Sequence, residues 1–193
     1  MADFRKRTTS DEGVELIKRF EGCVLKAYKA VATEKFWTIG FGHYGPDVHQ
    51  GDVITMERAT ELLKLDLQNA ESYVNKAGQW TQHEFDALVS FTYNCGPGNM
   101  ALLIRSRNKQ QIADAMLLYV KSGGITLQGL VRRRRAERQM FLLDGAIDDV
   151  ETVSKPPAGS DAPKPKKKVD KSVEDVETPK KRGRKPKDNS TKS

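Results

Sequence analysis

The sequence predicts an α+β domain in which helices dominate, with a small antiparallel sheet between a short N-terminal helix and a C-terminal helical lobe. Apolar residues recur at helical spacing over most of the chain up to about residue 145, whereas the interval 27–53 is rich in glycine, aromatic and β-branched residues. A third observation limits the domain: of the 193 residues, the last 40 hold six of the eight prolines and no aromatic side chain. We therefore expect one domain over 1–153 and a disordered basic tail over 154–193.

The charge distribution supports the same division. The whole chain has 33 Lys and Arg against 26 Asp and Glu, a net charge of +7. Residues 154–193 hold 13 basic and 6 acidic residues, which is also +7, so the remaining 20 basic and 20 acidic residues cancel. A basic tail of this composition is expected to bind anionic polymers or surfaces.

Several classes of protein are disfavoured by simple counts. The longest apolar run, Ala115 to Val120, has six residues, whereas a membrane-spanning helix needs roughly 20. The basic residues near Met1 are not followed by an apolar stretch, so no signal peptide is predicted. Cys23 and Cys95 have no CxxC spacing, so we expect two buried free thiols, no structural metal and synthesis in a reducing compartment.

The first expected helix has both a start and a stop signal. Its apolar face comprises Val14, Leu16, Ile17 and Phe20. Ser10 or Asp11 can serve as N-cap, and Gly22 can end the helix. The interval that follows contains the stretch 36–45, with Trp37, Ile39 and Phe41, and fits short strands joined by turns better than a helix. Alternation along a strand sends Trp37 and Ile39 to one face and Thr38 and Gly40 to the other, so we interpret Trp37 as a core residue.

The remainder is predicted as a succession of helices. A long helix should follow Thr55, and Thr81 should cap the next, which we expect Gly96-Pro97-Gly98 to end. Asn108 and Gln111 have the spacing of a capping box before a further helix. A last helix is expected from about Leu127 to Leu143.

Glu21 is the first candidate for chemistry. It closes the first helix and is followed by the glycine-rich strand segment, a junction at which a carboxyl can be partly buried beside a groove and suited to act as a general acid. Taken alone this signal is weak, because most glutamates at helix ends are solvated.

The motifs around Glu21 resemble those of the phage-type lysozymes, the muramidases and endolysins of glycoside hydrolase family 24. The matching segments, in the family's order, are Phe20-Glu-Gly22, Leu25-Lys-Ala-Tyr-Lys29, Trp37-Thr-Ile-Gly-Phe-Gly-His43, 81–91, Tyr93-Asn-Cys-Gly96 and 129–137. The resemblance covers about residues 10–145, three quarters of the chain. It implies a lysozyme-like fold and a lysozyme activity: hydrolysis of the β-1,4 bond between N-acetylmuramic acid and N-acetylglucosamine in bacterial peptidoglycan, with lysis of the host.

The resemblance also implies roles for particular residues. Glu21 corresponds to the family's general acid and Thr38 to the threonine that holds the attacking water. Gln82, Asn94 and Gly98 correspond to the far wall of the substrate groove. No cofactor or metal is implied, and a monomer is expected. The enzyme would be made in the host cytoplasm and would reach the wall after release through a holin-type pore.

One departure from the family pattern concerns the second carboxylate. The family places Asp nine residues after the general acid, where this chain has Ala30, and the segment before Thr38 is about two residues longer than usual. The only acid between Glu21 and Thr38 is Glu34. Inversion needs a second carboxylate roughly 6.5–9.5 Å from the first to activate water.

Two enzymatic hypotheses follow from this departure. Either Glu34 is the base, which we favour, or no base is used and the sugar's own 6-hydroxyl attacks, as in a lytic transglycosylase that forms 1,6-anhydro products. A third hypothesis is a non-catalytic domain that binds peptidoglycan or, through its tail, nucleic acid.

Other polar features have structural interpretations. His43 is expected to make a structural hydrogen bond or ion pair. Ser90 and Ser106 have no histidine partner in any motif, so no serine nucleophile is predicted. The run 132–135 is Arg-Arg-Arg-Arg, which on a helix surrounds the axis and makes no single basic face, so we expect pairing with acids such as Glu137 or Asp144.

The tail contains one motif of its own. Arg182-Gly-Arg-Lys-Pro186 resembles an AT-hook, but Lys185 displaces the proline that usually follows the second arginine. We favour a plain polyelectrolyte that binds anionic wall polymers or lipid surfaces, with DNA as an alternative.

Overall fold

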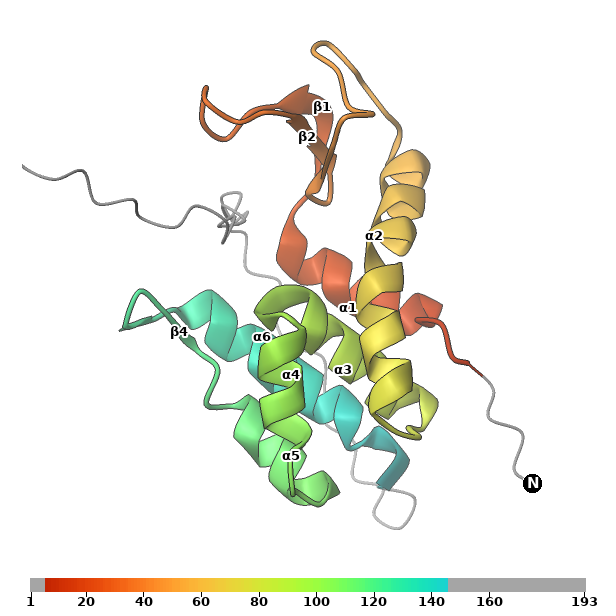
Figure 1. Cartoon of the computed structure of the whole chain (residues 1–193), viewed down its shortest axis with the longest axis vertical. Coiled ribbons are helices and arrows are strands. Elements are labelled where there is room, and N and C mark those ends of the chain that lie inside the picture. Colours follow the sequence, from red (N-terminus) through yellow and green to blue (C-terminus); the bar gives the residue numbers. More distant parts are fainter. Residues whose placement is uncertain (1–5, 146–193) are drawn as a thin grey trace, which may run out of the picture.

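The computed structural model describes residues 6–145, and the tail predicted over 154–193 lies outside the described residues. The elements are α1 (Asp11–Glu21), β1 (Val24–Tyr28), β2 (Trp37–Gly40), β3 (His43–Gly45), α2 (Met56–Ala77), α3 (Gln82–Cys95), α4 (Pro97–Ile104), α5 (Lys109–Met116), β4 (Lys121–Ser122), β5 (Ile125–Thr126), α6 (Gln128–Phe141) and the 3₁₀ helix η1 (Leu143–Gly145). Figure 1 shows the sheet at one end of the molecule, the helical lobe at the other and α2 running between them. The predicted mostly helical α+β fold is confirmed.

Helix starts follow the predicted caps. The side chain of Ser10 accepts a hydrogen bond from the Gly13 amide and begins α1, and Thr55 begins α2 in the same way. Thr81 and Asn108 each form a complete capping box with the residue three positions later, at the starts of α3 and α5. These caps are local in sequence, which is why they were predictable.

The prediction of the chain path was incomplete at two places. Gly96-Pro97-Gly98 does end α3, but Pro97 also occupies the first turn of α4, a position that proline tolerates because its missing N–H has no partner there anyway. The two-stranded hairpin of β4 and β5 was not predicted. Its turn is Gly123-Gly124, and both glycines have positive φ.

The three-stranded sheet is antiparallel with order β1-β2-β3. Thr38 in β2 lies opposite Tyr28 in β1 and opposite Tyr44 in β3, and Val24 at the start of β1 lies opposite Gly40. The backbone of Gly40 has φ +63 and approaches α2 closely, since a Cβ built there would lie 3.2 Å from Cβ of Ala59. The sheet is thereby fixed against the N-terminal half of α2.

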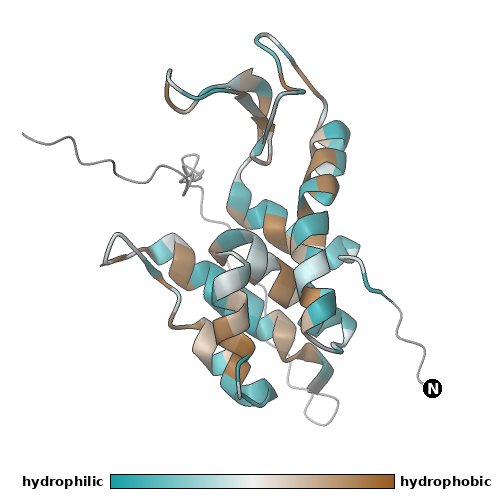
Figure 2. Ribbon diagram, in the orientation of Figure 1, coloured by the Kyte–Doolittle hydropathy of each residue, from teal (hydrophilic) through white to brown (hydrophobic). Residues whose placement is uncertain are grey.

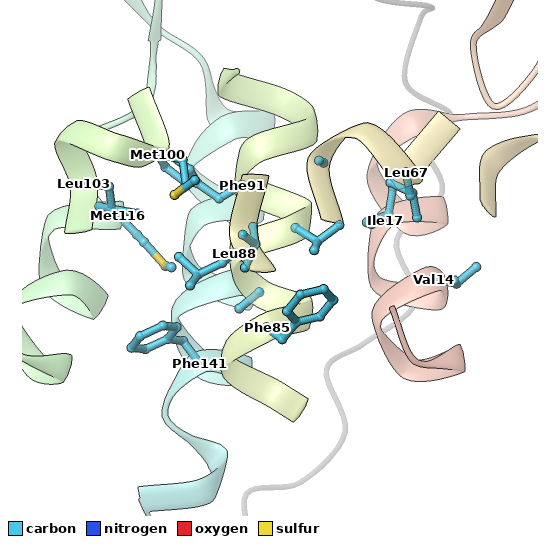
Figure 3. Packing of buried hydrophobic residues seen from close by; sticks show 14 of the residues in the cluster. Val14, Ile17, Leu67, Phe85, Leu88, Phe91, Met100, Leu103, Met116 and Phe141 are labelled. Carbon is cyan, nitrogen blue, oxygen red and sulfur yellow. The ribbon is translucent and has the colours of Figure 1, made fainter. Parts of the chain in front are cut away.

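The main core surrounds α3. Every residue of α3 from Glu84 to Thr92 is buried. In Figure 3 the side chains of α3 lie between those of α1 and α2 on one side and those of α4 and α5 on the other; the labelled residues are Val14, Ile17, Leu67, Phe85, Leu88, Phe91, Met100, Leu103, Met116 and Phe141. Burial of large apolar side chains at roughly 1.5–3 kcal/mol each makes this cluster the main source of stability.

A second, smaller core holds the sheet to α2. It comprises Ala27, Ile39, Val48 and Leu62, with Trp37 packed against it. Trp37 therefore faces the core as predicted, although it is only half-buried. Figure 2 shows that the helices carry both hydrophobic and hydrophilic residues along their length. Among residues 6–145 no helix is both long and apolar enough to cross a bilayer.

Candidate active site

Glu21 is the last residue of α1, and its position depends on the residue after it. Gly22 has φ 66, a left-handed conformation that glycine adopts without strain, and this lets the chain turn from α1 into β1. The side chain of Glu21 is 18% exposed. The predicted junction of helix and strand therefore leaves this carboxylate partly accessible at the start of the sheet.

A buried arginine holds Glu21. Nη1 of Arg133, on α6, donates to Oε1 of Glu21, although the two residues are 112 positions apart. The carboxylate lies at the negative end of the α1 dipole, which disfavours its charge, and the guanidinium offsets this. Only 1% of the Arg133 side chain is exposed, so little solvent screens the pair from that side.

Arg133 belongs to a buried polar cluster that we call the arginine cluster: Ser90, Arg133, Arg134 and Glu137. Oε1 of Glu137 accepts from Oγ of Ser90 at 2.7 Å, from Nε of Arg133 at 2.9 Å and from Nη2 of Arg134 at 3.1 Å. Burial lowers the pKa of Arg133, but the charges of Glu137 and Glu21 outweigh burial and the net shift is upward. The cluster is therefore a charged, rigid support behind Glu21.

The prediction for the run 132–135 is confirmed in part. Arg133 and Arg134 are buried and pair with Glu137, as expected. The other acid that we suggested, Asp144, instead contacts His83 at 2.6 Å. The contact between Arg133 and Glu21 was not predicted, and no local sequence signal indicates it. Ser90, for which no nucleophilic role was predicted, donates to Glu137 within this cluster.

Asn94 is linked to Glu21 through the arginine cluster. Its Oδ1 accepts from Nη2 of Arg134 at 2.8 Å, so the arginine cluster connects the two residues. The neighbouring Tyr93 has a raised pKa, first because it is buried and then because the carboxylates of Glu21 and Asp66 oppose ionisation. Gly98 follows on the exposed first turn of α4, with no atom within 4 Å of a Cβ built there. Asn94 and Gly98 thus remain candidates for substrate contact.

Gln82 has a different place. Its Nε2 donates to the Thr8 carbonyl and to Oδ1 of Asp86, both at 3.0 Å, at the N-terminal end of α1. Glu21 is at the other end of that helix, about 15 Å away at 1.5 Å per residue. The structure does not bring Gln82 together with Glu21, and the hydrogen bonds of its side chain support the N-terminal segment.

Glu34 lies in the connection between β1 and β2. Its Oε2 accepts a hydrogen bond from the amide of Ala30 at 2.9 Å, so the carboxylate folds back to the position where the family places Asp. The pKa of Tyr28 in β1 is raised by burial and then by the charge of Glu34. Thr38, half-buried in β2, is the strand partner of Tyr28. Thr38 is therefore on the strand pair that starts three residues after Glu21, and Glu34 is in the connection between its two strands.

His43 and the cysteines serve the framework. His43 contacts Oδ1 of Asp66 at 2.9 Å and Oδ2 of Asp47 at 3.0 Å, which confirms its predicted structural ion pair. Cys23 and Cys95 are free, as predicted, but half-buried and not buried, and burial raises the pKa of each thiol. Within the described part of the chain, no group of three His, Cys, Asp or Glu residues is arranged to hold a metal ion.

The fold and the arrangement of residues around Glu21 define the class of protein to which this chain belongs. A family model described as phage lysozyme matches residues 18–137, and the chain belongs to that family. It is 46% identical over 154 residues to an endolysin of Bacillus phage B103, an alignment that covers 76% of this chain and 59% of the relative. An endolysin of Salmonella phage P22 is 38% identical over 144 residues, covering 69% of this chain and 97% of the relative.

Solved structures agree with this membership. An endolysin from Escherichia coli O157:H7 phage FAHEc1 superposes with a TM-score of 0.62 at 36% identity, covering 75% of this chain and 99% of that one. The chain spans 54–59% of the length of the first curated relatives that it matches.

Proposed function

We propose that this chain is an endolysin that hydrolyses the β-1,4 bond between N-acetylmuramic acid and N-acetylglucosamine in bacterial peptidoglycan. The observation that carries the proposal is the partly exposed Glu21 at the end of α1, supported from below by buried Arg133, in a member of the phage lysozyme family. Peptidoglycan is the proposed partner, with no cofactor. The protein would act as a monomer on the wall, after synthesis in the host cytoplasm and release through a pore made by another protein.

Glu21 is proposed as the general acid. Breaking a glycosidic bond requires protonation of the leaving oxygen, and a carboxyl that is covered by a bound sugar ring favours its protonated form. Arg133 fixes the orientation of the carboxyl by a hydrogen bond to one oxygen, Oε1. The second oxygen, Oε2, is then the one that would face the substrate.

Glu34 is proposed as the base and Thr38 as the residue that holds the attacking water. The hydrogen bond from Ala30 to Glu34 supports this assignment, because it brings a carboxylate to the position that the missing Asp would occupy. Asn94 and Gly98 are proposed as substrate contacts at the far side of Glu21.

The decisive experiment is mass spectrometry of the fragments released from purified peptidoglycan. Reducing N-acetylmuramic acid ends would support hydrolysis, and Glu34→Gln should then lower the rate roughly 100-fold or more. Anhydro ends would support a lytic transglycosylase, the alternative that Ala30 favours, and would make Glu34 a bystander. No release by folded protein would leave a binding domain.

Glu21→Gln tests the general acid, with Glu15→Gln as a matched control. Both residues are on α1 and both are ion-paired, but Glu15 is 62% exposed and contacts only Lys18 in the described structure. We expect Glu21→Gln to lose at least about 100-fold in turbidity clearance and Glu15→Gln to match wild type. Lysis at the wild-type rate by Glu21→Gln would refute the assignment.

The basic tail is proposed to hold the enzyme on anionic wall polymers or lipid surfaces without taking part in the chemistry. Its 13 basic residues against 6 acidic ones support this. Deletion of residues 154–193 should weaken binding to isolated walls at low salt and leave activity on soluble fragments unchanged. Equal wall binding with and without the tail would reject the proposal, and selective binding to A·T-rich DNA would favour the AT-hook alternative.

A further inference from the structure

The connection 29–36 between β1 and β2 is held by its own side chains. Nζ of Lys29 donates to the backbone carbonyl of Glu34 at 2.7 Å, and the amide of Ala30 donates to Oε2 of Glu34 at 2.9 Å. At the far end, the amide of Phe36 donates to the hydroxyl of Tyr44 at 3.2 Å. Both the backbone and the side chain of Glu34 are therefore fixed, each by a different neighbour.

We propose that Lys29 is a positioning residue for Glu34, and that its ammonium holds the connection in the form that presents the carboxylate to substrate. This inference rests on the proposed role of Glu34 as base. Lys29 takes no part in the chemistry itself.

The ammonium of Lys29 is well placed for this task. It lies 5.4 Å from the ring centroid of Trp37, so the cation is held between an aromatic ring and the Glu34 carbonyl. Trp37 in turn packs against the second core. These two contacts restrict the rotamers of the Lys29 side chain, whereas an exposed lysine keeps its rotamer freedom. The conformational entropy is therefore lost before substrate binds.

Lys29 donates to the backbone carbonyl of Glu34, whereas the amide of Ala30 donates to the carboxylate oxygen Oε2. A base must remain available to take a proton from water, and a direct ion pair would compete with that proton. Fixing the backbone of Glu34 orients the carboxylate while leaving one of its oxygens, Oε1, for water.

Lys35 provides a matched control. It is in the same connection, adjacent to Glu34, and its ammonium also lies over an aromatic ring, 4.9 Å from the centroid of Phe36. It is exposed, and no hydrogen bond from its side chain to Glu34 is present in the described structure. Replacing either lysine by methionine lowers the charge of the connection by one, but of the two lysines Lys29 is the one that donates to Glu34.

The test is a double-mutant cycle on soluble peptidoglycan fragments. Lys29→Met should lower kcat about tenfold with KM within about twofold of wild type, because binding is kept and orientation is lost. Lys35→Met should change neither, and Lys29→Arg should retain most of the activity because it keeps a donor and a charge. In a Glu34→Gln background, Lys29→Met should add less than a twofold loss. Full multiplication of the two losses, or a loss confined to KM, would overturn the proposal.

A second measurement separates this inference from the proposed function. Hydrogen exchange of the Ala30 amide reports its bond to Glu34 whatever the chemistry. Lys29→Met should accelerate this exchange about fivefold or more, as should Glu34→Ala, which removes the acceptor, whereas Lys35→Met should not. If Glu34→Gln kept full activity, the base assignment would fail, but faster exchange in Lys29→Met would still support the hold on Glu34. Unchanged exchange in folded Lys29→Met would overturn it.

Discussion

Glu137→Gln is the sharpest perturbation of the framework behind Glu21. Glu137 is fully buried and is the acceptor for Ser90 and for both buried arginines of the arginine cluster. Glutamine keeps the size and shape of the side chain but removes its charge. It also places an NH₂ group where one oxygen faced an arginine or hydroxyl donor.

The expected loss of stability follows from the charge balance among the arginine cluster and Glu21. Arg133 and Arg134 carry two positive charges and Glu21 with Glu137 two negative ones, a balance of zero that becomes +1 in the variant. Because the two guanidinium side chains are 1% and 0% exposed, water cannot replace the lost carboxylate. Removing one partner of a buried ion pair costs about 3–5 kcal/mol. For a domain of this size we expect a fall in Tm of roughly 6–20 °C.

The assay is thermal unfolding followed by circular dichroism or calorimetry at neutral pH, with Glu61→Gln as the control. Glu61 makes the same type of contact with Arg58, at 2.8 Å, but the two side chains are 53% and 63% exposed. The control should lose less than about 1 kcal/mol. If Glu137→Gln melted no lower than Glu61→Gln, the reasoning that charge balance stabilises the arginine cluster would be refuted.

Two further predictions concern the N-terminal half of the fold. Burial lowers the pKa of His43, but Asp47 and Asp66 outweigh it and the net shift is upward from 6.5; the stabilisation is therefore complete below that value and lost as pH rises through the folded pKa. His43→Gln should thus lower the free energy of unfolding more at about pH 5.5 than at about pH 8.5, and an equal loss at both would contradict this. Gly13→Ala should destabilise by about 2 kcal/mol in urea unfolding, because its Cβ would lie 2.7 Å from Cγ of Asp86 and from Cγ2 of Thr9. Gly129→Ala, with no atom within 4 Å, should be neutral or stabilising by up to about 1 kcal/mol, and similar behaviour of the two variants would show that the contact at Gly13 is not tight.

Features that depend on neighbours along the chain were predictable. Ser10, Thr55, Thr81 and Asn108 each accept from an amide three positions later, so short polar residues before an apolar-periodic stretch mark the helix starts. The same local signals were ambiguous at Pro97. A proline between two glycines ends one helix and can also begin another, and only the packing of α4 on α3 decides between these outcomes.

In the candidate site, too, some residues were predictable from the sequence and others were not. The resemblance of one short interval to the family pointed to Glu21 and Thr38, and Glu34 was the only acid between them. Burial of Arg133, by contrast, contradicts the expectation from its charge, since an isolated arginine in a polar run is normally solvated. Two carboxylates accompany its burial: Glu137, four residues away on α6, and Glu21, 112 positions away on α1. The first contact follows from helical spacing, but no local pattern encodes the second.

The contrast between Gln82 and Glu34 has the same physical origin. The resemblance to the family placed Gln82 among the site residues, yet the packing of α3 on α1 brings its side chain to the Thr8 carbonyl. Glu34 was only the nearest acid to Thr38, and the fold of its connection brought its carboxylate to Ala30. Helix caps and strand alternation are set by interactions between near neighbours, so the order of residues is enough to predict them. Which charges meet, and which are buried, depends on long-range packing and desolvation, and these arise only when the whole domain has folded.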